Sequence, residues 1–105
     1  MAKPPLLTQN ELDSQLAELN ANAQSPWAIS DGKLNRRYEF ASFSDAFGFM
    51  AQSALACESL DHHPRWVNVW NVVEISLLTH RADGITHLDF DLAGKMEPIA
   101  KKLLT

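Results

Sequence analysis

The sequence predicts an α+β fold in which three helices pack on one face of a four-stranded antiparallel sheet, in the order α-β-β-α-β-β-α. The helices are predicted by side chains that cap their first turns, and the sheet by two pairs of β-rich segments that are each divided by a two-residue turn. The length of 105 residues, 46% of them hydrophobic and 21% charged, is typical of one domain over residues 1–105.

The first helix begins at a capping box formed by Thr8 and Glu11. In this motif each residue accepts a backbone hydrogen bond from the other, which satisfies amides that the first helical turn leaves free. Leucines then recur at helical spacing as far as Leu19, and the polar residues 20–24 end the pattern.

The first hairpin is predicted from residues 27–29 and 34–41, which flank the turn pair Asp31-Gly32. Alternate residues of the second strand share one face, and a charged side chain on that face, Arg36, weakens the expectation that it is fully buried. The apolar residues on this face are Leu34, Tyr38 and Phe40.

The second helix is predicted to start at Ser42 and to be the longest of the three, ending before Pro64, which cannot continue a helix. Glu58 continues the stripe of residues that is expected to face the core, and it lies where that face of the helix ends. The stripe itself consists of Phe43, Phe47, Met50 and Ala54.

The second hairpin is predicted from residues 66–69 and 72–80, which are rich in β-branched side chains and separated by Trp70-Asn71. On this pattern Trp70 is expected to pack in the core, whereas Trp66 can either pack or stack on a planar ligand. Strand alternation to residue 80 would place His80 on the face opposite the apolar side chains.

The last helix is predicted to start where Thr86 and Asp89 repeat the spacing of a capping box. Lys101 and Lys102 favour its carboxyl end, where cations stabilise the helix dipole. Pro98 inside the pattern predicts a kink or a shorter helix.

Charge and cysteine content exclude several classes of protein. The formal net charge of -4 argues against direct nucleic-acid binding through a basic face. The sequence has no apolar run approaching the roughly 20 residues of a membrane span, and no signal peptide is expected. The single cysteine, Cys57, excludes an intrachain disulfide and a cysteine-rich zinc site, and it favours a reducing, cytoplasmic setting.

All four histidines fall between positions 62 and 87, and two carboxylates, Glu58 and Asp61, lie near the first pair. Carboxylates at the carboxyl end of a helix oppose its dipole, and such local conflicts tend to mark functional sites. The simpler interpretation is that Glu58 reaches solvent beside a Lys or Arg, and that Asp61 merely ends the helix. The histidines are His62, His63, His80 and His87.

The histidines suggest acid-base chemistry more strongly than metal binding. Neighbouring imidazoles rarely converge on one ion, and no metal-ligand spacing supports them. If His62, His63 and His80 line one pocket with Glu58, one imidazole can donate a proton while another accepts one, which suits elimination or hydration. We expect His87 to be a surface residue of the last helix, and Cys57 to be a core residue rather than a nucleophile.

The spacing of seven residues identifies a family. Glu58-x-x-x-His62-His63-Pro64, followed by residues at positions 70, 80 and 89, closely resembles the signature of pterin-4a-carbinolamine dehydratases. The strings at residues 47–50, 60–64, 66–69 and 79–80 are similar to the same family, and the resemblance extends from about Trp27 to the last helix. The three residues at those positions are Trp70, His80 and Asp89.

The resemblance implies a hydro-lyase, 4a-hydroxytetrahydrobiopterin dehydratase. Its substrate is what an aromatic amino acid hydroxylase leaves when it uses its tetrahydropterin cofactor. Loss of water gives quinonoid dihydropterin, which a reductase returns to the tetrahydro form, so the reaction recycles tetrahydrobiopterin. It needs no metal and no organic cofactor.

The resemblance also implies roles for individual residues. The three histidines His62, His63 and His80 form the catalytic and pterin-binding set, with Glu58 and Asp61 orienting them or stabilising charge. Trp66 forms a wall of the pocket. Thr79 and Arg81 flank the ligand. Asp89 matches the signature too, and we interpret it as a capping residue that fixes the loop behind His80.

Two further expectations follow from the resemblance. The family forms dimers or dimers of dimers, so we expect a homodimer or homotetramer, and the sequence does not choose between them. Some members also stabilise dimers of a transcription regulator through a helix face, so a protein-interaction module is the alternative function. A metal-dependent lyase is a weaker third hypothesis.

Overall fold

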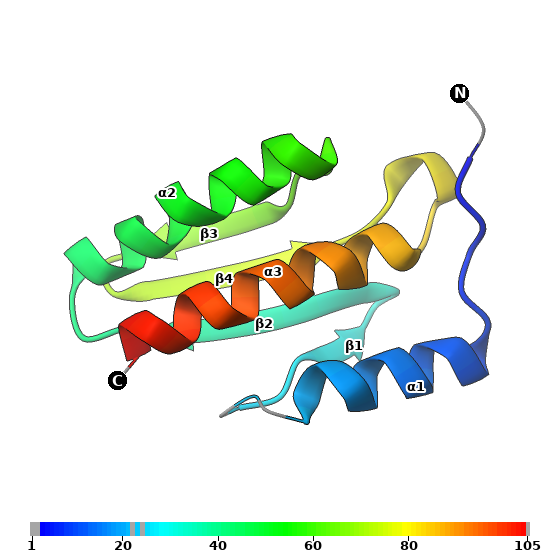
Figure 1. Cartoon of the computed structure of the whole chain (residues 1–105), viewed down its shortest axis with the longest axis horizontal. Coiled ribbons are helices and arrows are strands. Elements are labelled where there is room, and N and C mark those ends of the chain that lie inside the picture. Colours follow the sequence, from blue (N-terminus) through cyan, green and yellow to red (C-terminus); the bar gives the residue numbers. More distant parts are fainter. Residues whose placement is uncertain (1–2, 22, 24, 105) are drawn as a thin grey trace.

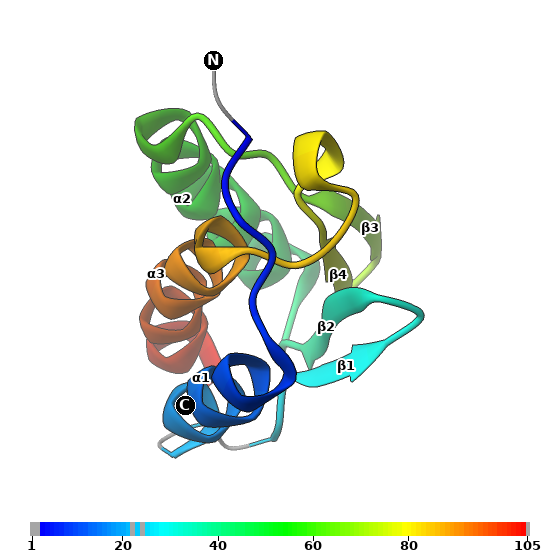
Figure 2. The ribbon, with the colours of Figure 1, turned by 90° about the vertical axis from the view of Figure 1, so that its right-hand side faces the viewer.

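The computed structural model describes residues 3–21, 23 and 25–104, and it confirms the predicted α+β fold and element order (Figure 1). The four antiparallel strands lie in the order β1-β2-β4-β3. The helices lie on one side of this sheet, which Figure 2 shows edge-on. The elements are α1 (Gln9–Asn20), β1 (Ala28–Ser30), β2 (Lys33–Glu39), α2 (Phe43–Leu60), β3 (Arg65–Val69), β4 (Val72–Leu77), a 3₁₀ turn (His80–Ala82) and α3 (His87–Leu104).

Side-chain caps start α1 and α2 where the sequence predicts them. The Glu11 N–H donates to Thr8 Oγ1 at 3.2 Å, and the Thr8 N–H donates to Glu11 Oε1 at 2.8 Å. Ser42 Oγ accepts from the Asp45 N–H at 3.1 Å. Both helix starts are therefore local properties of the sequence.

The two hairpin turns are confirmed, but the last strand is shorter than predicted. Asp31 and Gly32 both have positive φ, 54° and 70°, as a tight hairpin turn requires. Trp70 also has positive φ, and its side chain is 69% exposed, so the expectation that it packs in the core is wrong. A side chain at the tip of a hairpin projects beyond the sheet. β4 ends at Leu77 because the following residues turn into the 3₁₀ segment.

The predicted core-facing stripe of α2 is wrong by about one residue. Phe43 and Phe47 are exposed, and the prediction that α2 is the longest helix also fails, because α2 and α3 both span 18 residues. Phe49 faces the sheet instead, where its ring lies 5.1 Å from that of Tyr38 and 5.4 Å from that of Phe40. The buried residues of α2 are Ala46, Phe49, Ser53 and Cys57.

The charged side chain on the buried face of β2 is explained by a polar cluster inside the core. Glu97 of α3 is buried, and its Oε1 lies 3.8 Å from Nε of the Arg36 guanidinium. The same oxygen accepts hydrogen bonds from Trp27 Nε1, at 2.9 Å, and from the Tyr38 hydroxyl. Burial, and then the bond to Glu97, raise the pKa of Tyr38, so this hydroxyl stays a neutral donor.

Helix α3 continues through Pro98, so the alternative of a shorter helix is wrong. Proline has no N–H to give to the carbonyl of Gly94 four residues earlier, and the Pro98 side chain is exposed. We expect Pro98→Ala to raise the free energy of unfolding by about 1–2 kcal/mol in urea denaturation. Pro5→Ala, in an exposed non-helical segment, is the control and should change it little. No gain for Pro98→Ala would contradict this reasoning.

Candidate active site

The end of α2 sends two adjacent histidines in different directions. Asp61 has left-handed backbone, with φ 49° and ψ 45°. Its N–H donates to the Glu58 carbonyl at 3.2 Å, and the His62 N–H donates to the Cys57 carbonyl at 3.0 Å. This pair of bonds is a Schellman motif, which ends the helix and turns the chain. His62 then points into the protein and is buried, whereas His63 is exposed.

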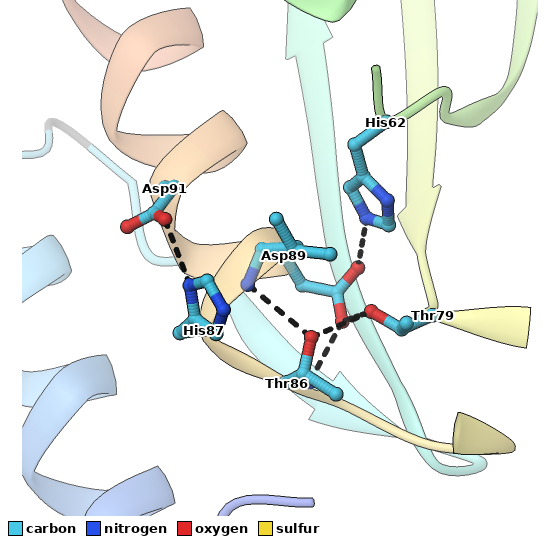
Figure 3. Close-up of polar contacts among 7 residues, drawn as sticks. His62, Thr79, Thr86, His87, Asp89 and Asp91 are labelled. Carbon is cyan, nitrogen blue, oxygen red and sulfur yellow. Dashed lines mark hydrogen bonds and ion pairs between the residues drawn. The ribbon is translucent and has the colours of Figure 1, made fainter. Parts of the chain in front are cut away.

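The buried histidine is held by a carboxylate from α3 (Figure 3). His62 Nε2 lies 2.6 Å from Asp89 Oδ1, and Asp89 is fully buried. The other carboxylate oxygen, Oδ2, accepts from the Thr79 hydroxyl and from the Thr86 N–H, both at 2.9 Å. An ionised carboxylate only accepts hydrogen bonds, so we infer that Nε2 of His62 carries a proton. Nδ1 is then the ring nitrogen left for chemistry.

Asp89 has one function that the sequence predicts and one that it does not. The bond from the Thr86 N–H confirms that Asp89 caps the start of α3. The contact with His62 joins residues 27 positions apart, and no local pattern indicates it. In the sequence, a role for Asp89 beyond helix capping is indicated by its match to the family signature. It is a positioning residue for His62 rather than only a helix cap.

The exposed histidine pairs with Glu58. His63 Nε2 lies 2.7 Å from Glu58 Oε1, and the two side chains are 56% and 79% exposed. The expectation that Glu58 sits at the edge of the core-facing stripe is wrong, because the stripe of α2 is shifted and Glu58 falls on the solvent side. An ion pair this exposed contributes little to stability.

A cavity of about 320 Å³ brings the two histidines together with a third. One wall comes from the chain after α2, and the other from the 3₁₀ turn after β4. Because β4 ends at Leu77, strand alternation does not continue to His80, and the turn places His80 on the cavity. The lining residues are Asp61, His62, His63, Leu78, Thr79, His80 and Arg81.

Two residues predicted for this site do not line the cavity. Trp66 lies on β3, is half-buried and packs against the core. Glu58 reaches the site only through His63. Cys57 is buried, as predicted, and burial raises the pKa of its thiol, which disfavours the nucleophilic thiolate.

The fourth histidine lies apart from the other three. His87 is the first residue of α3, and its Nδ1 lies 3.0 Å from Asp91 Oδ2 at the surface (Figure 3). A larger groove of about 860 Å³ between α1 and α3 is lined by no histidine. The three remaining histidines therefore converge on the smaller cavity.

Metal-binding clusters and membrane-spanning helices are both absent from the part of the chain that the structure describes. Residues 3–21, 23 and 25–104 contain no group of three or more His, Cys, Asp or Glu side chains that could hold a metal ion. Within the same residues, none of the helices has the length and apolar character needed to cross a bilayer.

Comparison with known proteins gives one consistent family. The family model for pterin 4 alpha carbinolamine dehydratase matches residues 5–99. Two curated relatives named for this dehydratase, from Solibacter usitatus and Chelativorans sp., are 47% and 44% identical over 90% and 91% of this chain and 94% and 95% of their own length. The crystal structure of a transcriptional coactivator/pterin dehydratase from Brucella melitensis superposes with a TM-score of 0.81 at 43% identity, covering 90% of this chain and 98% of that one. The chain belongs to the pterin-4-alpha-carbinolamine dehydratase family of hydro-lyases.

Proposed function

We propose that the protein dehydrates 4a-hydroxytetrahydropterin to quinonoid dihydropterin and water in the cavity between α2 and the 3₁₀ turn. The observation that carries this proposal is the convergence of His62, His63 and His80 on one cavity, with His62 held by a buried carboxylate. The reaction would serve tetrahydrobiopterin recycling for an aromatic amino acid hydroxylase in the cytoplasm.

The reaction requires two proton transfers, one to the substrate and one from it, so the enzyme neither gains nor loses a proton overall. The C4a–O bond breaks as a proton reaches the 4a-hydroxyl, which leaves as water. The proton on the adjacent N5 is removed, and its electron pair forms the C4a=N5 double bond. Histidines suit both transfers near neutral pH, and general acid-base help of this kind contributes roughly 10²–10⁴-fold per group.

The geometry supports a division of the proton transfers among the three histidines. Asp89 holds the Nε2 proton of His62, so the proton that His62 exchanges with substrate resides on Nδ1. Asp89 also fixes the orientation of the His62 ring during the reaction. His63 and His80 are exposed, so they can return protons to water or take them from it.

The remaining lining residues have binding and positioning roles in this proposal. Asp61 and Arg81 present opposite charges on the cavity, and these suit hydrogen bonds to the donors and acceptors of a pterin ring. The Thr79 hydroxyl is already used by Asp89, so Thr79 positions the site. Glu58 orients His63 from the solvent side.

The dehydratase activity can be tested directly. Purified protein is mixed with 4a-hydroxytetrahydropterin that a hydroxylase generates in the same cuvette, and the absorbance of the quinonoid product is followed. We expect dehydration faster than the spontaneous reaction, and a rate equal to the spontaneous one would sink the proposal. Protein that is exhaustively chelated and freed of chelator before the assay should show full activity, since the proposed mechanism uses no metal.

Asp61 allows its structural and substrate roles to be separated. Glycine suits the left-handed position at a helix end better than any other residue, so Asp61→Gly should leave unfolding in urea unchanged or raise its free energy by up to ~1 kcal/mol. If the carboxylate binds pterin, KM should rise about tenfold at the same time. Asp61→Asn tolerates the same backbone and is the control for charge. An unchanged KM in both variants would remove Asp61 from the binding site.

A second candidate function, as an interaction module, is favoured by the outer face of α2. Phe43, Phe47 and Leu55 are exposed there, with Leu55 at 74%, and the two rings lie 5.9 Å apart. We propose that this face joins copies into a homodimer or homotetramer, and that it can also receive a transcription regulator, as the name of the Brucella relative suggests for that protein. The contact would be with protein, not directly with DNA.

The interaction face makes a prediction that is independent of the cavity. Phe47→Glu should lower the mass measured by light scattering to that of a smaller assembly, because a charge replaces a large apolar contact. Dehydratase activity per chain should persist, since Phe47 is not among the residues lining the cavity. A mass unchanged from wild type would show that copies do not meet through this face.

A further inference from the structure

The wall of the cavity that carries His80 and Arg81 is a short turn closed by two backbone hydrogen bonds. The Thr79 N–H donates to the Gly84 carbonyl at 3.0 Å, and the Gly84 N–H donates back to the Thr79 carbonyl at 3.4 Å. Asp89 holds one end of the turn by accepting a hydrogen bond from the Thr79 hydroxyl. The other end of the turn, at Gly84, needs a separate support.

That support is the segment before α1, residues 3–8, which runs alongside the loop that joins the 3₁₀ turn to α3 (Figures 1 and 2). The Leu7 N–H donates to the Ile85 carbonyl at 3.2 Å, and the Leu7 side chain packs against the core. Leu6 lies on Gly84 so closely that a Cβ placed there would be 2.6 Å from Leu6 Cδ2. A Cβ at position 84 would therefore force the end of the Leu6 side chain to move away.

Burial in the core does not explain Leu6, which is 55% exposed. Its contact instead covers the backbone of the turn, at the residue whose N–H and C=O close it. An apolar side chain over a hydrogen-bonded backbone keeps water away and opposes opening of the turn. Leu6 is therefore placed to restrain the turn at Gly84.

We propose that Leu6, acting through Gly84, is a positioning residue that holds His80 and Arg81 on the cavity. The proposal rests on the dehydratase function proposed above. Loss of the Leu6 contact lets the turn open more often, so His80 spends less time in reach of the substrate. Because small displacements of a reacting group are costly, we expect kcat/KM to fall about tenfold.

A double-mutant cycle tests the contact itself. Leu6→Ala removes the atoms that cover Gly84, and Gly84→Ala pushes Leu6 away, so each should speed amide exchange at Thr79 and Gly84 and lower kcat/KM about tenfold. In the double variant the new methyl group at position 84 takes the space that Leu6 Cδ2 leaves. We expect the double variant to recover to within about threefold of wild type in both measurements, a rescue that a general loss of stability would not give.

Lys3→Ala is the control, because it lies in the same segment and is exposed. It should change neither amide exchange of the turn nor kcat/KM. Exchange is measured by NMR without substrate, so it tests the contact even if the wild-type protein has no dehydratase activity. The proposal is overturned if Leu6→Ala leaves exchange at Thr79 and Gly84 unchanged, if exchange rises while kcat/KM does not fall, or if the double variant shows no rescue.

Discussion

Replacing His62 with alanine is expected to lower kcat/KM for 4a-hydroxytetrahydropterin by about 10²–10⁴-fold, the contribution of one general acid-base group. His62 is the histidine whose ring is fixed, through the 2.6 Å contact of Nε2 with Asp89, so in the proposed reaction its Nδ1 would meet the substrate in one orientation. The variant is measured as a rate above the spontaneous dehydration, with substrate generated in the assay. Activity like that of wild type would remove His62 from the reaction.

The chain offers a matched control for this substitution. His87→Ala removes a histidine that lies at the surface beside Asp91, and it should leave kcat/KM unchanged. His80→Ala gives a second comparison, because His80 lines the same cavity but is exposed. Both cavity variants should lose activity, whereas His62→Ala alone should also lower the free energy of unfolding, by about 1 kcal/mol, since Asp89 loses one of its donors.

The sequence predicts the parts of this fold that depend on neighbouring residues. The capping box at Thr8 and the tight turn at Asp31-Gly32 are set within four residues, and both are confirmed. The register of α2 is different, because two stripes of its surface have helical spacing. Packing of Phe49 against the rings of β2 selects one of them, and nothing within α2 itself records that choice.

Sequence patterns are less informative about the direction of individual side chains. Spacing identifies the three histidines as a group, and the resemblance gives them a reaction. The direction of His80, however, depends on where β4 ends, and that point is set by bonds between Thr79 and Gly84. The burial of Arg36 is explained by its ion pair with Glu97 of α3, a residue 61 positions later in the sequence. The contact that explains Arg36 joins distant segments, whereas a local turn sets the direction of His80.

Replacing Asp89 with asparagine should cost both activity and stability, because this carboxylate accepts from three donors. Asparagine offers one accepting oxygen and one donating NH₂ group. If the oxygen keeps the bonds from Thr79 and Thr86, the NH₂ faces His62 Nε2, which must then give up its proton. His62 would hold its proton on Nδ1 instead, the wrong tautomer for taking a proton from substrate.

This change of tautomer is the measurable signature of the positioning role. Asp89→Asn should lower kcat/KM by at least about 10²-fold while the cavity keeps its shape, and ¹⁵N chemical shifts of His62 should report the shifted proton. Unfolding in urea should become easier by about 1–3 kcal/mol, because one buried bond to an ionised acceptor is lost. Asp91→Asn, the same change on the same helix beside exposed His87, should alter neither quantity. A loss of stability in Asp89→Asn with normal turnover would mean that the carboxylate only builds the start of α3, and that His62 needs no partner to react.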